Sequence, residues 1–472
     1  MTRARGDDGV VIATPQPFAE ALETAPLNAY FWRALALLVL AVVFDFFDFF
    51  LVGFLMAVVG PAWHMTYAQV SIVLVSAGVG SIVSGLVSGW LADVFGRKIM
   101  IIAGVALASL GSGLVGFVPD GAWHLFAALR FLVGLGLAAT STGVLALTVE
   151  MTPLRVRTVI SGAMAIPASI GILIASTLAS QLMPVAGWRG LALCGLVPLL
   201  LVIPMVIFVP ESARWLAARG RREEAARVVS RQIHRPVDLP PPPQAPRTGS
   251  RGGLIELLAY PRQLLFILII WLAYSTVSYA ISLWGPTILA MRLTLTPAKA
   301  AGLFALVGLG GLIGRIVFSI LPQFIGRRRS GQLTGAGMAV GLTIVAFAGG
   351  GTVGTVPLLL VALVASALFF DGGGVNIAPI PAEIFPARLA GRGSGFGQAA
   401  NGIGKVLGPV ALALIAGAND FVSPKATAAS VTPAFLLLAA CGVATFLAFT
   451  LLGVETHRQI ARDEDHAADL SV

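Results

Sequence analysis

Charged side chains are scarce in this sequence. Asp, Glu, Lys and Arg make up 11% of the 472 residues, while 57% are hydrophobic and the mean hydropathy is +0.90. A water-soluble protein of this size needs far more polar surface to stay in solution. The lack of charge therefore excludes an ordinary soluble fold and indicates a chain embedded in a lipid bilayer.

Cysteine is nearly absent, and other chemical signatures are missing. Cys194 and Cys441 both lie in apolar stretches, which argues against a disulfide framework and suits small buried side chains. His64 and His124 lie in or beside loops without other metal ligands nearby. No phosphate-cradling loop and no nucleophile–base arrangement is visible, so we expect no enzymatic activity, no metal and no cofactor.

We expect no cleavable signal before the first apolar stretch. Residues 1–28 are polar and mixed in character. A secretory signal would instead place a short apolar run between a basic start and a cleavage site. We therefore expect the first membrane span itself to direct insertion.

Twelve apolar windows are long enough to cross a bilayer, since the hydrocarbon core takes about 20 residues of helix. The first six lie near residues 33–57, 68–91, 99–118, 123–148, 158–182 and 191–210. The second six lie near 264–288, 299–322, 333–350, 356–380, 393–417 and 432–453. The sequence therefore predicts an all-α membrane protein with twelve transmembrane helices.

One long polar segment separates the two sets of windows. It carries a proline run at 240–243, a composition typical of a mobile linker. Its first part, 213–232, is rich in Ala, Arg and Glu and predicts a surface helix. The predicted organisation is a tail at 1–32, a six-helix half at 33–210, a linker at 211–263, a second six-helix half at 264–453 and a tail at 454–472.

The 31 Lys and Arg residues are distributed unevenly over this map. Only Arg189, Arg292, Lys299 and Lys425 fall in loops on the side opposite the N-terminus. Cytoplasmic loops of membrane proteins carry the excess of positive charge. We therefore expect a multi-pass protein of the inner (plasma) membrane with both tails and the linker in the cytoplasm. The excess of basic over acidic residues then reflects membrane orientation and contact with lipid headgroups, and not nucleic-acid binding.

The two predicted halves repeat each other's loop motifs. The segment after the second span, 89–98, contains Gly-Arg-Lys, and the segment after the eighth, 319–328, contains Gly-Arg-Arg. A Glu-x-x-Pro run followed by two arginines occurs at 150–157, after the fourth span, and again at 383–392, after the tenth. A duplicated six-span unit is what a substrate site at the interface between two halves requires.

The first of these motifs, Gly-x-x-x-Asp-x-x-Gly-Arg-Lys, resembles the signature of the major facilitator superfamily. The resemblance extends to Arg130-x-x-x-Gly134-x-Gly136 on the fourth span and to the Glu-x-x-Pro-x-x-x-Arg run. The Pro-Glu-Ser run at 210–212 is similar to the sugar-porter and metabolite–proton symporter branches. The resemblance covers nearly the whole chain and implies twelve helices in two six-helix pseudo-symmetric halves around a central cavity.

The loop motifs fit a conformational latch between access states. A glycine at position 89 would let neighbouring helices approach closely, and Asp93 can accept bonds from an Arg or a helix N-terminus across a gap. Such a contact forms in one access state and breaks in the other. The alternative is a signal for topology and folding. The predicted latch residues are Gly89, Asp93, Gly96, Arg97, Glu150, Arg157, Glu383 and Arg388.

The second-half copy of this motif departs from the pattern of the superfamily. Gln323 replaces the loop acid, and Ala390 stands where an arginine is usual. The latch is therefore incomplete in sequence in the second half.

Three charged residues lie within the first and fourth spans. Asp45 and Asp48 are three residues apart, so they share a helical face that must point into the bundle. They lie about 18 and 22 Å from the cytoplasmic end, and Arg130 lies about 10 Å from the opposite end. In a core of roughly 30 Å these depths are similar. The predicted proton-coupling residues are Asp45, Asp48 and Arg130, and the resemblance implies that Asp48 and Arg130 form the coupling pair; the alternative is a permanent ion pair.

Three further charges lie within the second half. The placement of Arg315 on the eighth span is similar to the anion-binding arginine of monocarboxylate and oxalate carriers. Lys405 lies on the eleventh span, and Asp371 lies in the middle of the tenth. One interpretation is a cationic cradle for a carboxylate, with Asp371 balancing the charge when the site is empty. The alternative is that Arg315 or Lys405 is locked to Asp371 or reaches the interface.

Polar and aromatic residues recur at helical spacing on the seventh span. Tyr274, Ser278 and Tyr279 are predicted to line the cavity, together with Asn401 on the eleventh span. The alternative is a polar stripe that holds neighbouring helices together.

The absence of two further motifs narrows the substrate class. Sugar porters carry Gln on the seventh and fifth spans, but the corresponding segments 274–279 and 169–174 have none. Drug–proton exchangers carry Gly-Pro-x-x-Gly-Gly on the fifth span, and Pro167 and Gly171 lack that arrangement. Both absences favour an organic acid over a hexose or a drug.

These observations together predict a secondary active transporter. We expect proton-coupled symport, as uptake, of a small organic anion such as an aromatic acid or monocarboxylate, by alternating access. The proton gradient would be its energy source, and we expect it to act as a monomer. The main alternative is a sugar or polyol symporter. A non-transporting sensor is a lesser alternative, since sensors usually carry an extra soluble domain.

Overall fold

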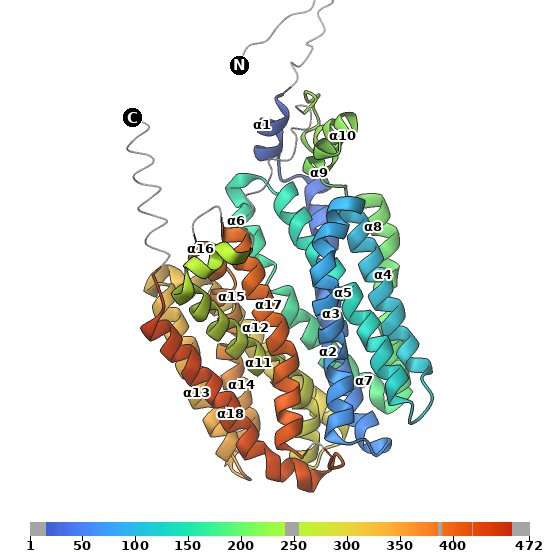
Figure 1. Ribbon diagram of the computed structural model, residues 1–472. Coiled ribbons are helices and arrows are strands. Elements are labelled where there is room, and N and C mark those ends of the chain that lie inside the picture. Colours follow the sequence, from blue (N-terminus) through green and yellow to red (C-terminus); the bar gives the residue numbers. More distant parts are fainter. Residues whose placement is uncertain (1–15, 241–253, 386–388, 418, 456–472) are drawn as a thin grey trace, which may run out of the picture.

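The computed structural model describes residues 16–240, 254–385, 389–417 and 419–455. Helices form nearly all of the regular structure in these ranges (Figure 1). One short antiparallel pair, β1 (Thr352–Val353) and β2 (Val356–Pro357), joins two helices of the second half. The predicted all-α architecture is therefore confirmed.

The helices of the first half follow the predicted spans. They are α2 (Ala29–Ala62), α3 (Tyr67–Phe95), α4 (Arg97–Leu114) with the 3₁₀ turn η1 (Val115–Phe117), α5 (Trp123–Met151), α6 (Leu154–Ala163), α7 (Pro167–Leu193), η2 (Cys194–Leu201) and α8 (Val202–Phe208). The first span begins earlier than residue 33, because Asn28 accepts a hydrogen bond from Phe31 N and caps the helix there.

The second half contains the corresponding set. Its helices are α11 (Pro261–Arg292), α12 (Pro297–Ile325), α13 (Arg327–Phe347), α14 (Leu358–Phe370), α15 (Gly372–Ile377), α16 (Ile380–Glu383), α17 (Ala390–Ile415) and α18 (Pro424–Leu451). The predicted tenth span runs through three successive helices, with Asp371 between the first two, and the backbone at Asp371 keeps right-handed helical angles, φ -84° and ψ -42°.

Eleven helical stretches of the described residues are long and apolar enough to cross a membrane. One of them, Pro167–Phe208, has 42 residues. At about 1.5 Å per residue it would be about twice the thickness of the hydrocarbon core. Its backbone leaves the helical conformation at Gly187, where φ is 63°, and the chain turns back. This stretch therefore contains most of the predicted fifth and sixth spans, although residues 158–163 of the fifth belong to the separate helix α6, and the chain crosses twelve times.

The two halves use the same helix pairings. In the first half α3 and α4 pack on α5, and α2 packs on α7. In the second half the equivalent helices α12 and α13 pack on α14, and α11 packs on α17. The halves meet through three symmetric or near-symmetric contacts: α7 with α12, α3 with α17, and α2 with α11. The predicted duplication is thus confirmed at the level of packing.

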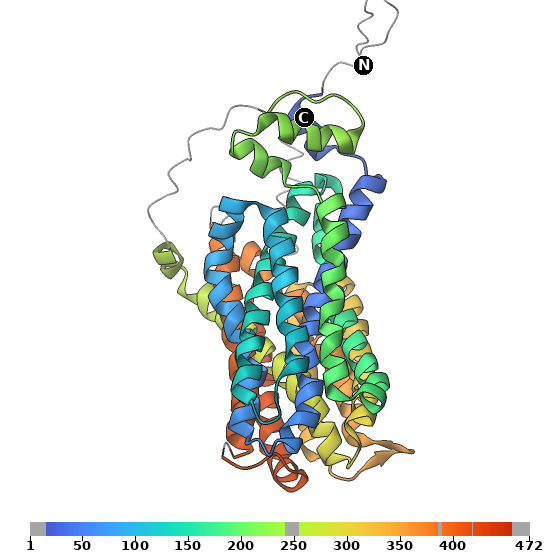
Figure 2. The ribbon, with the colours of Figure 1, turned by 90° about the vertical axis from the view of Figure 1, so that its right-hand side faces the viewer.

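The polar linker lies at one end of the bundle, together with α1 (Phe18–Glu23) (Figures 1 and 2). The predicted surface helix at 213–232 is two helices, α9 (Ala213–Ala218) and α10 (Arg222–Ile233), because Gly220 turns the chain with φ at 77°. Residues 241–253, which include most of the proline run, lie outside the described residues. We call this the linker end and the opposite one the far end.

Glycine sets the distance between the helices of the first half. A Cβ at Gly134 on α5 would collide with the backbone of Ala77 on α3, and one at Gly136 with the backbone of α4. The second half repeats this, since Gly314 on α12 lies against the backbone of Leu368 on α14. Small residues let helix backbones approach closely in a bilayer, where packing replaces the hydrophobic effect between helices.

Replacement of Gly134 by valine should therefore destabilise the first half. Overpacking of a tight contact costs about 1–3 kcal/mol, and here the obstacle is backbone that cannot rotate away. Gly85→Val on α3 is the matched control, because no described atom lies within 4 Å of a Cβ there. Thermal unfolding in detergent should show a lower midpoint for Gly134→Val alone; equal midpoints for the two variants would contradict the assignment.

Candidate functional site

The far ends of the two halves are joined by backbone hydrogen bonds between loops. Tyr67 N donates to Asp420 O at 3.0 Å, and Val422 N donates to Met65 O at 3.2 Å. Next to them the ring of Tyr67 lies 5.5 Å from that of Trp284 on α11. These contacts close the space between the halves at the far end.

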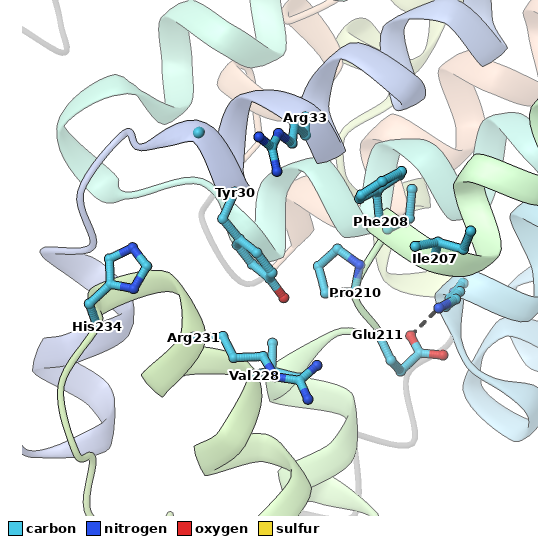
Figure 3. Close-up of a pocket in the computed structure, with 12 residues that line it drawn as sticks. Tyr30, Arg33, Ile207, Phe208, Pro210, Glu211, Val228, Arg231 and His234 are labelled. Atoms are coloured by element: carbon cyan, nitrogen blue, oxygen red, sulfur yellow. Dashed lines mark hydrogen bonds between the residues drawn. The ribbon is translucent and has the colours of Figure 1, made fainter.

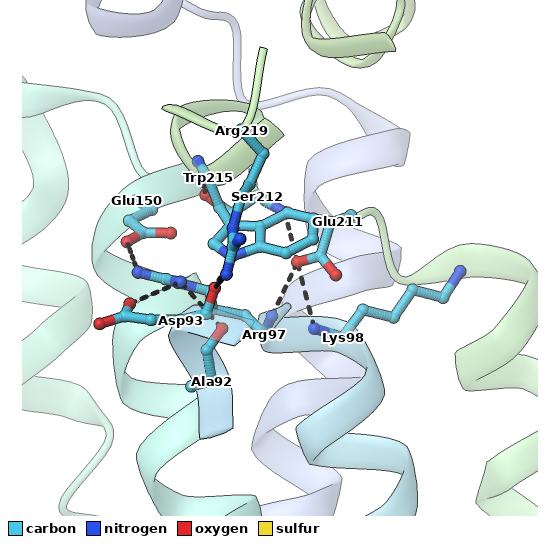
Figure 4. A network of polar contacts seen from close by, with 9 residues as sticks. All are labelled: Ala92, Asp93, Arg97, Lys98, Glu150, Glu211, Ser212, Trp215 and Arg219. Atoms are coloured by element: carbon cyan, nitrogen blue, oxygen red, sulfur yellow. Dashed lines mark hydrogen bonds and ion pairs between the residues drawn. The ribbon is translucent and has the colours of Figure 1, made fainter. Parts of the chain in front are cut away.

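At the linker end, the described ion pairs run within one half each. Arg97 contacts Asp93 at 3.0 Å and Glu150 at 3.3 Å in the first half (Figure 4). Arg327 contacts Glu383 at 2.7 Å in the second half, although Gln323 replaces the loop acid there. The charge cluster is therefore present in both halves and, among the described residues, does not cross between them in this conformation.

The sequence did not predict the role of the two glutamates that cap a helix beside each cluster. Glu211 accepts hydrogen bonds from Arg97 N at 2.9 Å and Lys98 N at 3.2 Å, at the start of α4 (Figure 4). Glu455 does the same for Arg327 N and Arg328 N at the start of α13. An acid at a helix N-terminus satisfies free N–H groups and the helix dipole. The repeat of Glu after each half's last span was the available signal.

The remaining predicted latch residues have local roles here. Gly96 is the residue between α3 and α4, with φ at 99°. Arg157 donates to Thr152 O at 3.0 and 3.1 Å. The expectation of a close helix approach at Gly89 is wrong for this conformation, since no described atom lies within 4 Å of a Cβ there. Arg388 lies outside the described residues.

Asp48 and Arg130 meet in the middle of the first half. Arg130 Nη1 lies 3.5 Å from Asp48 Oδ1, and both residues are 2% exposed or less. Nη2 of the same arginine donates to the carbonyls of Asp48 and Phe49 at 3.0 and 3.2 Å. Ser112 on α4 donates to Asp48 Oδ1, while Oδ2 has no hydrogen-bond partner among the described residues. The predicted pairing at equal depth is therefore formed.

Asp45 lies one turn away with a different partner. It is buried, as predicted for the face it shares with Asp48. Its Oδ2 accepts a hydrogen bond from Ser141 on α5 at 3.2 Å, and no cation lies within 4.0 Å of it in the described chain. The hydroxyls of Ser112 and Ser141 were not predicted, since serine is too common in spans to single out a partner.

Arg315 and Asp371 form the corresponding pair of the second half. Arg315 Nη2 donates to Asp371 Oδ1 at 2.8 Å. The pair also reaches the first half: Arg315 Nη1 donates to Ala165 O at 2.8 Å, and Ser169 donates to Asp371 Oδ2 at 3.2 Å. Ala165 lies in the break between α6 and α7. The tenth span thus places its carboxylate at the interface between the halves.

Lys405 is in a different environment from the two arginines. Its Nζ lies 5.1 Å from the ring centre of Tyr279 on α11 and 5.7 Å from that of Phe49 on α2. Within the described residues no carboxylate lies within 4.0 Å of it. Phe49 also carries the carbonyl that Arg130 binds, so the lysine environment and the Asp48 pair meet at this residue.

The seventh-span residues divide between the two predicted roles. Ser275 donates to Asn401 Oδ1 at 2.7 Å and joins α11 to α17, which favours the helix-holding alternative for Asn401. Tyr279 stacks on Phe50 and faces Lys405. Tyr274 and Ser278 are buried on α11, and Gly374 of α15 faces the Tyr274 hydroxyl. Their part in binding stays a prediction.

Comparison with known proteins gives a consistent result. A family model described as the Major Facilitator Superfamily matches residues 38–409. The chain is 25% identical to the 4-hydroxybenzoate transporter PcaK of Acinetobacter baylyi over 84% of this chain and 88% of that one. It is 25% identical to the niacin transporter NiaP of the same species, over 84% and 90%. It is 27% identical to the gallate transporter of Pseudomonas putida, over 83% and 88%.

Solved structures support the fold. A crystal structure of a D-xylose–proton symporter superposes with a TM-score of 0.70 at 16% identity, covering 91% of this chain and 99% of that one. A partially occluded inward-open structure of the xylose transporter XylE from E. coli gives 0.69 at 14% identity, covering 90% and 100%. At these identities the likeness concerns architecture alone. The family and these relatives are transporters and not enzymes.

Removal of the Asp371 charge should destabilise the protein. Breaking a buried ion pair by removing one partner costs about 3–5 kcal/mol, whereas replacing both by apolar groups is close to neutral. We therefore expect a large loss of unfolding free energy in detergent for Asp371→Asn. The double variant Arg315→Met with Asp371→Leu should recover most of it. A double variant no more stable than the single one would contradict a paired site.

Proposed function

The chain belongs to the major facilitator superfamily and is a multi-pass membrane transporter, and on this premise we propose that it takes up an aromatic carboxylate together with protons. Relatives are named for 4-hydroxybenzoate, niacin and gallate. Each of these compounds combines an aromatic ring with a carboxylate. We therefore assign the same chemical class to this chain, with other small monocarboxylates as the wider group.

The observation that carries this proposal is the environment of Lys405. Its ammonium lies over two aromatic rings and next to no described carboxylate. A ligand that brings an anionic group to the ammonium and a ring to Tyr279 and Phe49 satisfies both at once. Arg315, by contrast, is held by Asp371 at 2.8 Å. We therefore assign Lys405 as the residue that binds the substrate carboxylate. Arg315 is assigned as a residue that is released from its ion pair when Asp371 changes partner.

Proton coupling is assigned to Asp48 and Arg130. The ionised carboxylate leaves Oδ2 without a described partner, in a site where charge is costly. A proton on Oδ2 removes the charge, weakens the attraction to Arg130 and lets the guanidinium change partners. Arg130 also binds the carbonyl of Phe49, whose ring lies beside Lys405. A change of partner by Arg130 would therefore alter the surroundings of Lys405 in the substrate site.

The arrangement of the halves supports alternating access. Their far ends are joined, while the ion pairs described at the linker end stay within each half. We propose that the linker end is cytoplasmic in an inner membrane, because it carries the excess of Lys and Arg. Proton and substrate would then enter from outside when the far end opens. A monomer suffices, with the proton gradient and no other cofactor as the source of energy.

Substitution of Asp48 by asparagine should abolish gradient-driven uptake. The amide cannot carry the proton, so proteoliposomes with an imposed inward proton gradient should accumulate no aromatic acid above the level without a gradient. Asp120→Asn, a matched change in an exposed loop, should accumulate normally. The panel includes aromatic acids, short hydroxy acids and hexoses. Full gradient-driven uptake by Asp48→Asn would remove the coupling assignment, and preferential hexose uptake would favour a sugar symporter.

Replacement of Lys405 by glutamine should weaken binding of aromatic acids selectively. A hydrogen bond to a charged group contributes about 1.5–3 kcal/mol, which corresponds to roughly 10- to 100-fold in affinity. Lys405→Arg keeps the charge and should recover part of this affinity. Calorimetric titration with 4-hydroxybenzoate checks both variants. Unchanged affinity in Lys405→Gln would show that another residue binds the carboxylate.

A further inference from the structure

A hollow lies outside the central site, at the linker end of the first half. It has a volume of about 550 Å³ and opens between the start of α2, the end of α8 and helix α10 (Figure 3). Tyr30 and Arg33 enter from α2, and Arg231 enters from α10. The central transport residues do not line it. A molecule bound in this hollow would therefore be distinct from the transported substrate.

The wall of this hollow is cationic. Arg33, Lys98 and Arg231 line it with His234, and Glu211 is the one acid among its described lining residues. Glu211 is already engaged, since its Oε1 accepts from the N–H groups of Arg97 and Lys98. In the described chain no carboxylate lies within 4.0 Å of Arg33 or Arg231. Two guanidinium groups thus face one space without an anion.

An apolar surface continues from the hollow along the outside of the bundle. Phe208 and Ile207 line its edge, and Leu200, Ile203 and Ile207 are 70%, 67% and 66% exposed. Their spacing of three and four residues places them on one face of the sixth span. Trp32, also exposed, lies beside Arg33 on α2, as expected for an aromatic at the headgroup level. The hollow therefore joins a cationic site to a face suited to acyl chains.

We propose that this hollow binds the phosphate-bearing headgroup of an anionic phospholipid. The phosphate would lie between Arg33 and Arg231, with Lys98 at the side, and the acyl chains would follow the stripe at Leu200, Ile203 and Ile207. A basic pocket at the headgroup level recognises such lipids by charge. A water-soluble phosphate compound would bind the cations but would make no contact with the apolar face at Leu200, Ile203 and Ile207. The bound lipid would tie linker helix α10 to the first half.

The test measures thermal unfolding of the full-length protein in neutral detergent during titration with lipid. Phosphatidylglycerol is compared with phosphatidylcholine of the same acyl chains, and inorganic phosphate forms a third arm. The variants are Arg231→Gln and Arg33→Gln. Arg227→Gln is the matched control, because Arg227 lies on α10, pairs with Glu223 at 3.6 Å and does not line the hollow. Arg231→Lys retains the charge.

Phosphatidylglycerol should raise the midpoint of the wild type at lower concentration than phosphatidylcholine. Each basic residue near a headgroup accounts for roughly fivefold in affinity, so Arg231→Gln and Arg33→Gln should each need roughly fivefold more lipid. Arg227→Gln and Arg231→Lys should resemble the wild type. Equal responses of Arg231→Gln and Arg227→Gln, or equal effects of the two lipids, overturn the site. Full stabilisation by inorganic phosphate alone overturns the lipid assignment. Since Arg231 is exposed on a surface helix, its variants should fold.

Discussion

The cost of placing charge in hydrocarbon is the constraint on which this structure depends. An ionised group within a span is tolerated only if it faces the bundle interior and finds a partner there. Asp48 with Arg130 and Arg315 with Asp371 satisfy this requirement, one pair in each half. Each pair determines which face of its helices points inward, and the lipid-facing sides are left to apolar residues. The orientation of four helices follows from two ion pairs.

Each half makes more helix–helix contacts within itself than with the other half. Glycine lets α3 approach α5 and α12 approach α14, backbone against backbone. At the linker end a glutamate caps the first turn of α4 and another caps that of α13, next to the arginine of each charge cluster. Contacts between halves are fewer, and several of them are hydrogen bonds that a rotation could exchange, such as the bond from Arg315 to Ala165.

Lys405 is a cation within a span that has no carboxylate within 4.0 Å among the described residues, and this makes it informative. Two aromatic rings replace the missing carboxylate, an interaction worth less than an ion pair in a dry site. A cation left in this state is stabilised by any anion that reaches it. The same reasoning distinguishes the hollow at the linker end, where Arg33 and Arg231 face one space. In both places, an incompletely satisfied cation marks where a negatively charged molecule can bind.

The sequence by itself determined the membrane class, the twelve crossings, the duplication and the inward position of Asp45 and Asp48, because hydropathy and helical spacing are local properties. It also placed Arg130 at the depth of Asp48, since rise along a helix is fixed. Tertiary structure alone decided that Arg315 rather than Lys405 takes Asp371, that Gly89 faces open space, and that Glu211 and Glu455 cap helices more than 100 residues away. Such choices depend on distances between helices far apart in the chain, which no local pattern specifies.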